Sequence, residues 1–539
     1  MGWSARLTVI KAQRRLHIIR RMSLPDAVLP LFLQIADVQN HQACVWLWHP
    51  SPDAFSVVWR GQFGQGKTLT VDAPRQQTGW TTTTLLTALP RASVVTVTVT
   101  NLRTGQHAQT AFSTPAGALA SAPLRFGWGG DVCGQGYGRH AQDGLQVFAV
   151  LKQQAFDFFI LCGDLIYADH ALPQDRPVPG EVPGTLWPNA LDNPYAELVG
   201  WAAPADVAQT LDAFRAKYLY LWADAHYRQF IQTTPMVYVL DDHEIYNNWT
   251  RDTRLDGDDR YPPSLTFETL RGDGLRAWHE FAPSAHPALR TIAPGFKVLH
   301  HGPWLDVFVI DARSQRAANS SNLQPVYGVD THWLGPTQLG ALTDAMTTST
   351  AVWKLLVSGT PLSTLVRDAD ALPPGDGTDI WDGVANGDHG LPLGRELEVS
   401  QLLSSLKQGQ VDNLVVLSGD VHFASAVHYS PQRAAFKDFS PFWEFINGPL
   451  HAGGFPAKPV DRTFGAQQVF VSASPWPATP PGPHCTSFGV AEIDRLEGVL
   501  TVRLCDESGQ VLFSQSLQPL RRDPVEWTPV PRPPSDCAC

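Results

Sequence analysis

The sequence predicts an α/β fold in which mixed sheets are flanked by helices and preceded by a small all-β sandwich. Residues 28–114 contain short apolar runs separated by turn residues, which is typical of antiparallel strands. From residue 124 onward, continuous apolar runs alternate with amphipathic stretches, which is typical of strands buried between helices. A chain of 539 residues also exceeds one ordinary core, so we expect one large domain and a smaller one.

The first predicted unit is the all-β sandwich. Its clearest strand runs from Val95 to Thr100, where valine and threonine alternate with the period of two that a half-buried strand requires. Short strands are expected at 31–35, 43–47, 56–59, 68–71, 81–85, 93–100 and 108–112. The sequence of this region contains no group of metal-ligating residues, so we expect a structural role. Residues 116–123 have the sequence AGALASAP, half of it alanine, and are predicted to be a linker.

The larger domain is predicted to alternate strands with helices. Amphipathic helices are expected at 141–154, 204–232, 336–347 and 395–408. Apolar strands are expected at 124–128, 158–161, 236–240, 305–310, 353–357 and 414–417. Strands that are apolar along their whole length favour a largely parallel or mixed sheet covered on both faces.

The predicted boundaries are a basic tail at 1–27, the sandwich at 28–118, the larger domain at 122–520 and a proline-rich tail at 521–539. The basic tail contains Arg14-Arg15 and Arg20-Arg21 ahead of an apolar stretch, an arrangement similar to a twin-arginine export signal. Because charged and helix-breaking residues interrupt that stretch, we expect a cytoplasmic protein. Export by a twin-arginine-like signal is the alternative.

The composition argues against several classes of protein. The net charge of −11 disfavours a general nucleic-acid or anionic-membrane binder. Apolar runs of the length that spans a membrane, about 18 residues, are absent from the sequence, so we expect no membrane insertion. The 7 cysteines are sparse and unpaired in spacing, which favours reduced thiols over disulfides or a zinc motif.

Acidic residues follow the ends of the predicted strands. They are Asp131, Asp164, Asp241, Asp311 and Asp420, and most have a second ligand type a few residues further on. Sites in α/β sheets form at the carboxyl ends of strands, so these side chains are expected to converge. Several carboxylates pack together only if cations compensate their charge. Oxygen donors with imidazole suit iron, manganese, zinc, magnesium or calcium, so the sequence predicts a metal centre.

Three motifs carry a resemblance to a known family. They are Gly163-Asp164-Leu165-Ile166-Tyr167, Asp241-Asp242-His243-Glu244 and Gly419-Asp420-Val421-His422. In this order they resemble the calcineurin-like metallophosphoesterases. With Asp311-Ala312-Arg313 and Asp379-Ile380-Trp381-Asp382-Gly383, the chain is similar to the PhoD-type alkaline phosphatase D branch. The resemblance covers about residues 28–515 and implies a metallophosphoesterase-type sandwich of mixed sheets, preceded by a fibronectin-like sandwich.

The resemblance also implies ligands for two metal ions. The first ion would be bound by Asp131, Cys133, Tyr167 and His422, the second by Asp242, Asn247 and Asp420, and Asp164 would bridge them. Whether Asp131, Cys133 or both bind the first ion is left open. Phenolate and thiolate ligands need a strongly charged cation at neutral pH, so we predict Fe³⁺ at the first site. Oxygen ligands at the second site favour Ca²⁺, with magnesium, manganese or zinc as alternatives.

The implied reaction is hydrolysis of a small-molecule phosphate ester, with monoester or diester preference left open. A metal-bound water becomes hydroxide near neutral pH without a protein base. His243 would stabilise charge or protonate the leaving oxygen, oriented by Glu244 or Asp241. A cation such as Arg313 or Arg139 would neutralise the phosphate oxygens. The alternative function is a non-catalytic scaffold with a degenerate metal domain, and the oligomeric state is not predicted.

Overall fold

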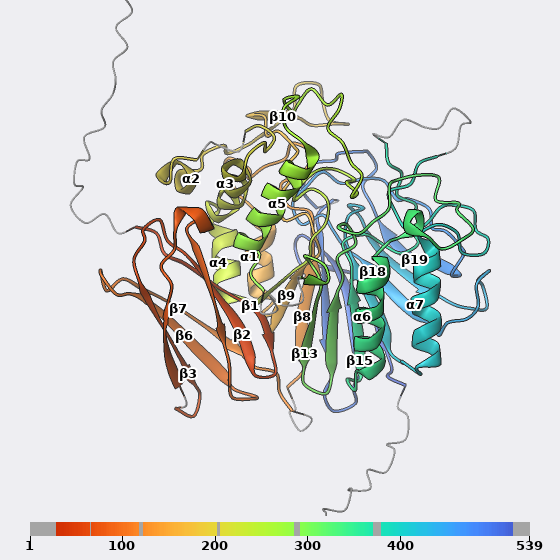
Figure 1. Cartoon of the computed structure of the whole chain (residues 1–539), viewed down its shortest axis with the longest axis horizontal. Helices are drawn as coiled ribbons and strands as arrows, with labels where there is room; N and C mark the ends of the chain where they lie inside the picture. Colours follow the sequence, from red (N-terminus) through yellow and green to blue (C-terminus); the bar gives the residue numbers. More distant parts are fainter. Residues whose placement is uncertain are drawn as a thin grey trace, which may run out of the picture.

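The computed structural model describes residues 29–64, 66–117, 122–201, 205–284, 291–369, 379–483 and 485–520. Two large mixed sheets lie face to face with helices on their outer sides, and a four-stranded sheet adjoins one of them (Figure 1). The predicted α/β fold with a preceding sandwich is therefore confirmed. The basic tail with its two arginine pairs and the proline-rich tail lie outside the described residues.

The larger sheet has nine strands and a parallel centre. In spatial order they are β22 (Val511–Leu517), β21 (Leu500–Asp506), β20 (Ser487–Ile493), β8 (Leu124–Gly129), β9 (Phe158–Leu161), β12 (Met236–Tyr238), β1 (Phe32–Gln39), β2 (Gln42–Trp48) and β5 (Thr81–Leu86). Strands β8, β9, β12 and β1 run parallel, and the others extend the sheet in antiparallel pairs. The three C-terminal strands were not predicted.

The second sheet has seven strands. In spatial order they are β13 (Lys297–His301), β14 (Leu305–Val309), β15 (Trp353–Val357), β16 (Leu414–Ser418), β18 (Phe442–Ile446), β17 (Ala424–Tyr429) and β19 (Ala466–Ser472). Strands β14, β15, β16 and β18 are parallel; the apolar runs predicted the first three, whereas β18 was not predicted. Every residue of β14 and β15 is buried, which explains why those runs contain no alternation.

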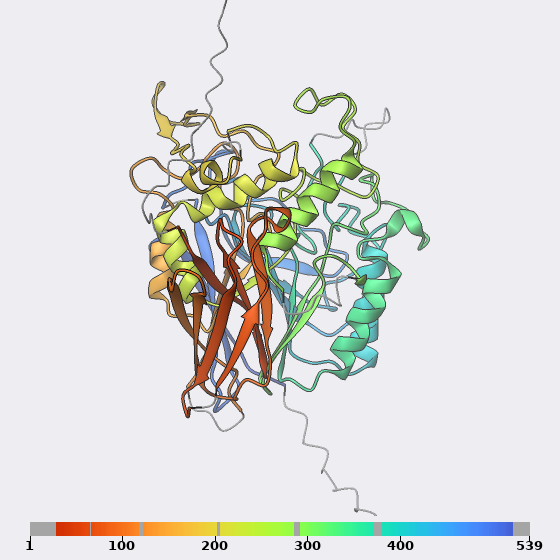
Figure 2. The ribbon, with the colours of Figure 1, turned by 60° about the vertical axis from the view of Figure 1, so that its left-hand side comes forward.

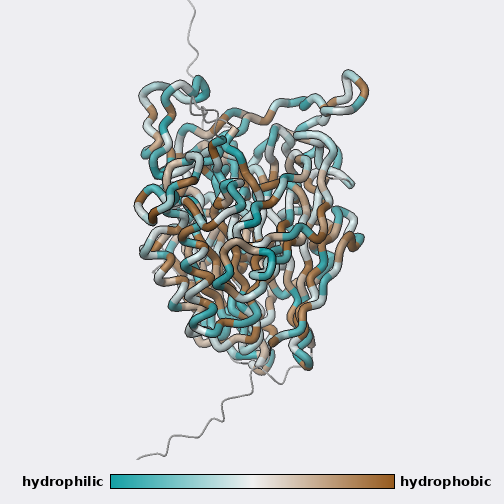
Figure 3. Tube along the Cα trace, turned by 90° about the vertical axis from the view of Figure 1, so that its right-hand side faces the viewer, coloured by the Kyte–Doolittle hydropathy of each residue, from teal (hydrophilic) through white to brown (hydrophobic). Residues whose placement is uncertain are grey.

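The two large sheets are joined by an apolar layer. The nine-stranded sheet contributes Phe126, Ile160 and Val237, and the seven-stranded sheet contributes Val307 and Leu355. Figure 3 shows the corresponding brown, hydrophobic stretches recurring through the body of the molecule. This layer sets the spacing of the two sheets, and therefore the distance between the loops at their ends.

Helices cover the outer faces of both sheets. They are α1 (Gln146–Gln153), α2 (Pro194–Leu198), α3 (Leu211–Trp222), α4 (Ala225–Thr233), α5 (Phe267–Phe281), α6 (Gly335–Thr348) and α7 (Glu396–Gln408). The first five pack on the nine-stranded sheet and the last two on the seven-stranded sheet, on the side opposite the sandwich (Figure 1 and Figure 2). Within the described residues, none of these helices is long and apolar enough to cross a bilayer.

One predicted helix is divided in the structure, and one observed helix was not predicted. The single helix expected at 204–232 is divided into α3 and α4, because the Asp224 carboxylate caps α4 by accepting a hydrogen bond from the Tyr227 N–H at 2.9 Å. Helix α5 was not predicted. It contains Gly272 and Gly274, which weaken the helical signal in the sequence. Tertiary packing compensates for them, since Gly274 allows close approach of Ile245.

The predicted sandwich shares a sheet with the larger domain. Its outer sheet has the order β4 (Gly66–Val71), β3 (Phe55–Gly61), β6 (Val94–Asn101) and β7 (His107–Ser113). Its inner layer consists of β1, β2 and β5, and β1 also pairs with β12 at Ala36 and Met236. The segments before and after the predicted boundary near residue 118 therefore both contribute strands to the nine-stranded sheet.

Strands β1 and β2 contribute to two cores at once. On one face, Phe32 and Trp46 stack against Trp222 of α3, with ring centroids 4.8 and 5.3 Å apart. On the other face, Val45 packs with Val97 of the outer sheet. All of β1 is buried, so the N-terminal strands complete the core of the larger domain.

We expect Trp46→Ala to destabilise the whole protein. Trp46 is fully buried, and its indole N–H donates to the Glu280 carbonyl at 2.6 Å. Loss of a buried indole costs roughly 3–5 kcal/mol. Thermal unfolding should therefore shift downward in one transition that includes the larger domain. The control is Val94→Ala at a position 48% exposed, which should change stability little. A separate early transition confined to the sandwich would contradict this expectation.

Candidate metal centre

Four parallel strands end at aspartates that lie near one centre. Asp131 follows β8, Asp164 follows β9, Asp242 follows β12 and Asp420 follows β16. Asp131, Asp164 and Asp420 have φ angles of 64°, 51° and 70°, the left-handed region that non-glycine residues rarely adopt. Backbone strain of this kind gathers at functional sites. Here it recurs after β8, β9 and β16, at three of the candidate ligands.

The carboxylates and imidazoles form four groups whose ligand atoms lie within 4.8 Å of one another. The groups are Asp131, Asp164 and His422; Asp164, Asp242 and His243; Asp241, Asp242 and Asp420; and Asp169, His170 and His243. Asp164 and Asp242 each belong to two groups, so the first three groups form one continuous cluster. The structure thus brings together most of the residues that the sequence predicted as ligands.

Several carboxylate oxygens of this cluster are buried without a hydrogen-bond partner. Within the described residues, both Oδ atoms of Asp131 and one each of Asp241 and Asp420 have no hydrogen-bond partner. Burial, together with Asp420 and Asp241, raises the pKa of Asp131 well above its usual value. Burial and Asp242 do the same for Asp164. Ionised carboxylates in such a place require a cation, and oxygen and imidazole donors fit a metal ion.

Tyr167 completes the first group. Its hydroxyl lies 2.8 Å from Nε2 of His422, which in turn lies 3.3 Å from Oδ1 of Asp131. The His422 ring is held by a hydrogen bond between its Nδ1 and the Gly453 carbonyl, so Nε2 points at the cluster. Burial, followed by the charge of Asp164, raises the pKa of Tyr167 well above its usual value. Only a nearby cation would reverse that shift and favour the phenolate.

Cys133 does not join the cluster. Within the described part of the chain, none of the four groups contains its Sγ atom. Burial raises the pKa of its thiol, and the charges that act on the thiol are those of Arg139, Asp224 and Lys217 rather than the cluster aspartates. Its backbone N–H donates to the His451 carbonyl at 2.6 Å. The sequence left open whether Asp131, Cys133 or both bind the first metal, and the geometry favours Asp131 alone.

The partner of His243 is Asp169, which the sequence analysis missed. Nδ1 of His243 lies 2.8 Å from Oδ1 of Asp169, and the imidazole stacks on the Tyr167 ring at 4.1 Å. Burial opposes protonation of the imidazole, but Asp169 and Asp242 raise the pKa of His243 to about 9. The prediction that Glu244 or Asp241 orients this ring is wrong. Asp169 lies five residues after Asp164, and that proximity was the signal available in the sequence.

Glu244 instead ties two strand ends together. Its Oε1 accepts a hydrogen bond from the Leu165 N–H at 2.8 Å, and its Oε2 accepts one from the Asp241 N–H at 3.0 Å. The carboxyl is fully buried, and burial raises the pKa of Glu244 to about 8. Glu244 therefore positions the loops after β9 and β12 and does not reach the centre of the cluster.

Arg313 is a buried counter-ion. Its guanidinium is inaccessible to solvent and pairs with Asp241 at 2.6 Å, Asp382 at 2.9 Å and Asp420 at 3.4 Å. The prediction that Arg313 neutralises phosphate oxygens is therefore wrong. Arg139, the alternative cation, is also engaged elsewhere, since its Nη2 lies 3.1 Å from Oδ1 of Asp192.

Asn247 lies beside the cluster. Its backbone N–H donates to Oδ2 of Asp169 at 2.8 Å. The next residue, Asn248, donates its N–H to Oδ2 of Asp242 at 2.7 Å. These two hydrogen bonds connect the loop after β12 to both Asp169 and Asp242. Binding of the second metal by the Asn247 side chain stays a prediction.

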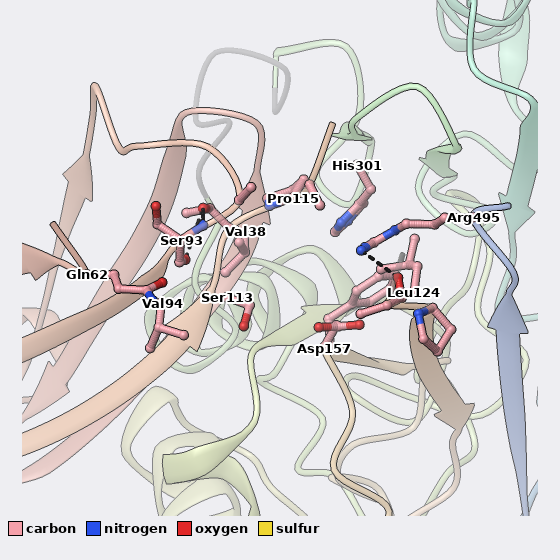
Figure 4. A pocket seen from close by; sticks show the side chains of 16 residues that line it. Val38, Gln62, Ser93, Val94, Ser113, Pro115, Leu124, Asp157, His301 and Arg495 are labelled. Atoms are coloured by element: carbon pink, nitrogen blue, oxygen red, sulfur yellow. Dashed lines mark hydrogen bonds between the residues drawn. The ribbon is translucent and has the colours of Figure 1, made fainter. Parts of the chain in front are cut away.

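A cavity of about 280 Å³ lies away from this cluster, where the sandwich meets the larger domain (Figure 4). Ser93 and Ser113 line it from the sandwich, and Asp157, His301 and Arg495 line it from the larger domain. Its described lining includes none of the candidate ligands. The cavity is a feature of the junction, whereas the chemistry is concentrated at the strand ends.

Comparison with known proteins agrees with this arrangement. The family model described as PhoD-like phosphatase matches residues 126–504. Alkaline phosphatase D of Bacillus subtilis (strain 168) is 26% identical over 256 residues, which cover 46% of this chain and 41% of that protein. The aligned stretch therefore spans less than half of this curated relative.

Two solved structures share the fold. The match to the structure of PhoD covers 91% of this chain and 92% of the PhoD chain, with a TM-score of 0.62 and 14% identity. The match to a purple acid phosphatase from yellow lupin (Lupinus luteus) seeds covers 90% of this chain and 74% of the phosphatase chain, with a TM-score of 0.54 and 12% identity. At these identities the likeness concerns the fold alone, and it confirms the predicted metallophosphoesterase-type arrangement.

We expect Arg313→Met to destabilise the protein by about 3–5 kcal/mol, because buried carboxylates lose their cation. Urea unfolding would measure the loss. Arg367→Met is the matched control, since the Arg367 side chain is 58% exposed and its pair with Asp379 should contribute little. If Arg313→Met instead leaves stability unchanged and weakens phosphate binding, Arg313 does neutralise phosphate oxygens, as the sequence suggested.

Proposed function

This chain belongs to the PhoD-like phosphatase family, and from that premise we propose that it hydrolyses phosphate esters of small molecules at the metal centre. The observation that carries the proposal is the continuous cluster around Asp164 and Asp242. Within the described residues, Arg313 pairs with Asp241 and Asp420, whereas neither carboxylate oxygen of Asp131 has a hydrogen-bond partner. A degenerate, non-catalytic domain would have no reason to keep this costly arrangement.

The ligands divide between two positions. We assign Asp131, Tyr167 and His422 to the first metal, Asp242, Asn247 and Asp420 to the second, and Asp164 to both. Bound metal ions would supply positive charge to the phosphate oxygens and lower the pKa of water. The chain itself holds these ligands rigid, since Glu244 and Arg313 tie their loops together beneath the cluster.

His243 is the residue we propose to protonate the leaving oxygen. Asp169 binds its Nδ1, so the other ring nitrogen, Nε2, remains for the substrate. Stacking on Tyr167 fixes the plane of the imidazole. The pair would therefore act as an oriented proton donor beside the metal ions.

We further propose ferric iron at the first position and calcium at the second. A buried tyrosine as ligand requires a strongly charged cation, because Tyr167 would otherwise stay protonated. Asp242, Asp420 and Asn247 offer oxygen donors that suit calcium. Magnesium, manganese and zinc are the competing ions at the second position.

The function is tested with purified protein and an aryl phosphate ester. We expect chelation to abolish hydrolysis. Asp164→Ala should lose metal and activity together, whereas His243→Ala should retain metal and lose roughly 10²- to 10⁴-fold in kcat. Elemental analysis and steady-state kinetics measure both. Full activity after complete removal of metal would reject the proposal, and equal metal loss in both variants would reject the role of His243.

The ferric assignment predicts visible absorption from a tyrosinate complex. We expect Tyr167→Phe to remove the band. Cys133→Ser should retain the band and the iron content, because the thiol lies outside the ligand groups. A visible spectrum beside iron analysis of each variant is the measurement. Loss of iron in Cys133→Ser with retention in Tyr167→Phe would reverse the two assignments.

A further inference from the structure

A segment at 451–461 runs from one side of the metal centre to the other, and we call it the strap. At its start, the His451 N–H donates to the Asp131 carbonyl at 3.0 Å. The Gly453 carbonyl of the strap accepts a hydrogen bond from the His422 ring. The Phe455 N–H of the strap donates to the His422 carbonyl at 3.2 Å. Its first half is therefore fixed to two ligands of the first metal.

The second half of the strap is fixed to the loop that follows β15. The Pro459 carbonyl accepts a hydrogen bond from the Leu365 N–H at 3.0 Å, and the Asp461 N–H donates to the Ser363 carbonyl at 2.7 Å. This loop begins at Gly359, where any side chain would collide with Asp241. The strap thus connects the ligands of the first metal with the surroundings of the second.

Lys458 lies between these two anchors. It stands between Pro456 and Pro459, whose fixed φ angles limit the conformations of the backbone. Its side chain is partly exposed. Among the described residues it has no ion-pair or hydrogen-bond partner, whereas Lys217 donates to the His170 carbonyl at 2.7 Å.

The charge of Lys458 reaches ligands of both metals. Phe455, three residues before Lys458, donates its N–H to the His422 carbonyl, and Pro459, directly after Lys458, accepts from the Leu365 N–H. The lysine charge acts on both His422 and Asp420, which belong to different metal positions. An ammonium between these anchors would attract an anion bound at the cluster. Arg313, the other cation here, is inaccessible to solvent and already paired.

We propose that Lys458 binds an unesterified oxygen of the phosphate and thereby favours monoesters with a terminal phosphate over diesters. This inference rests on the proposed phosphoesterase function. A monoester carries a charge of about −1.5 to −2 at neutral pH, whereas a diester has only one ionisable oxygen and a charge near −1. A monoester has three unesterified oxygens and a diester has two. A cation beyond the metals that is placed to meet the third oxygen forms a charge-assisted hydrogen bond with a monoester, whereas in a diester that oxygen is esterified.

The test compares 4-nitrophenyl phosphate with bis(4-nitrophenyl) phosphate. We expect Lys458→Met to lower kcat/KM for the monoester on the order of 10- to 100-fold, mainly through KM, and for the diester less than about threefold. Lys458→Arg should restore most of the monoester activity. Lys437→Met removes the same charge at an exposed position and should leave both activities unchanged.

Inorganic phosphate provides a second measurement that is independent of turnover. Its inhibition constant for bis(4-nitrophenyl) phosphate hydrolysis should rise about tenfold or more in Lys458→Met and return in Lys458→Arg. Equal losses on both esters, or no loss on the monoester, would overturn the role of Lys458 while the phosphoesterase function stands. Wild-type protein that hydrolyses neither ester would overturn the proposed function, and this inference with it.

Discussion

Negative charge concentrated at the ends of strands from two different sheets is the constraint on which this structure depends. Asp131, Asp164 and Asp242 come from the nine-stranded sheet and Asp420 comes from the seven-stranded sheet, and all four are largely inaccessible to solvent. Carboxylates in such proximity repel one another and lose their hydration, so the folded state requires positive charge at their centre. Arg313 supplies part of it from within the protein, and a bound metal ion would supply the remainder.

The same constraint explains the polar network beneath the cluster. Asp382 lies between Arg313 and Arg316, at 2.9 and 2.8 Å, and Arg395 donates to its carbonyl at 2.9 Å. Although burial opposes ionisation, these guanidinium groups hold the pKa of Asp382 well below its usual range. A buried network of this kind adds little net stability, but removing one partner leaves the others uncompensated. It therefore fixes the geometry of Arg313, and through Arg313 that of Asp241 and Asp420.

Packing between the layers of the fold makes the positions of the cluster aspartates depend on distant parts of the chain. The apolar contact between the two large sheets determines how closely Asp420 approaches Asp164, and the N-terminal strands complete the same nine-stranded sheet through the pairing of β1 with β12. A segment that carries no ligand, such as the sandwich, still contributes to the core under the site through Phe32 and Trp46. Catalytic geometry and global packing are consequently coupled.

The sequence by itself determined the layered α/β class, the chain order of the ligand types and their places after apolar strands, because continuous burial and strand-end aspartates are local patterns. Tertiary structure decided which side chains reach the cluster. Cys133 stands two residues from Asp131, yet the hydrogen bond that its N–H donates to the distant His451 carbonyl and its left-handed backbone place it outside. Asp169 and not Glu244 meets His243 for the same reason: side-chain direction depends on backbone handedness and long-range contacts, which no local pattern encodes.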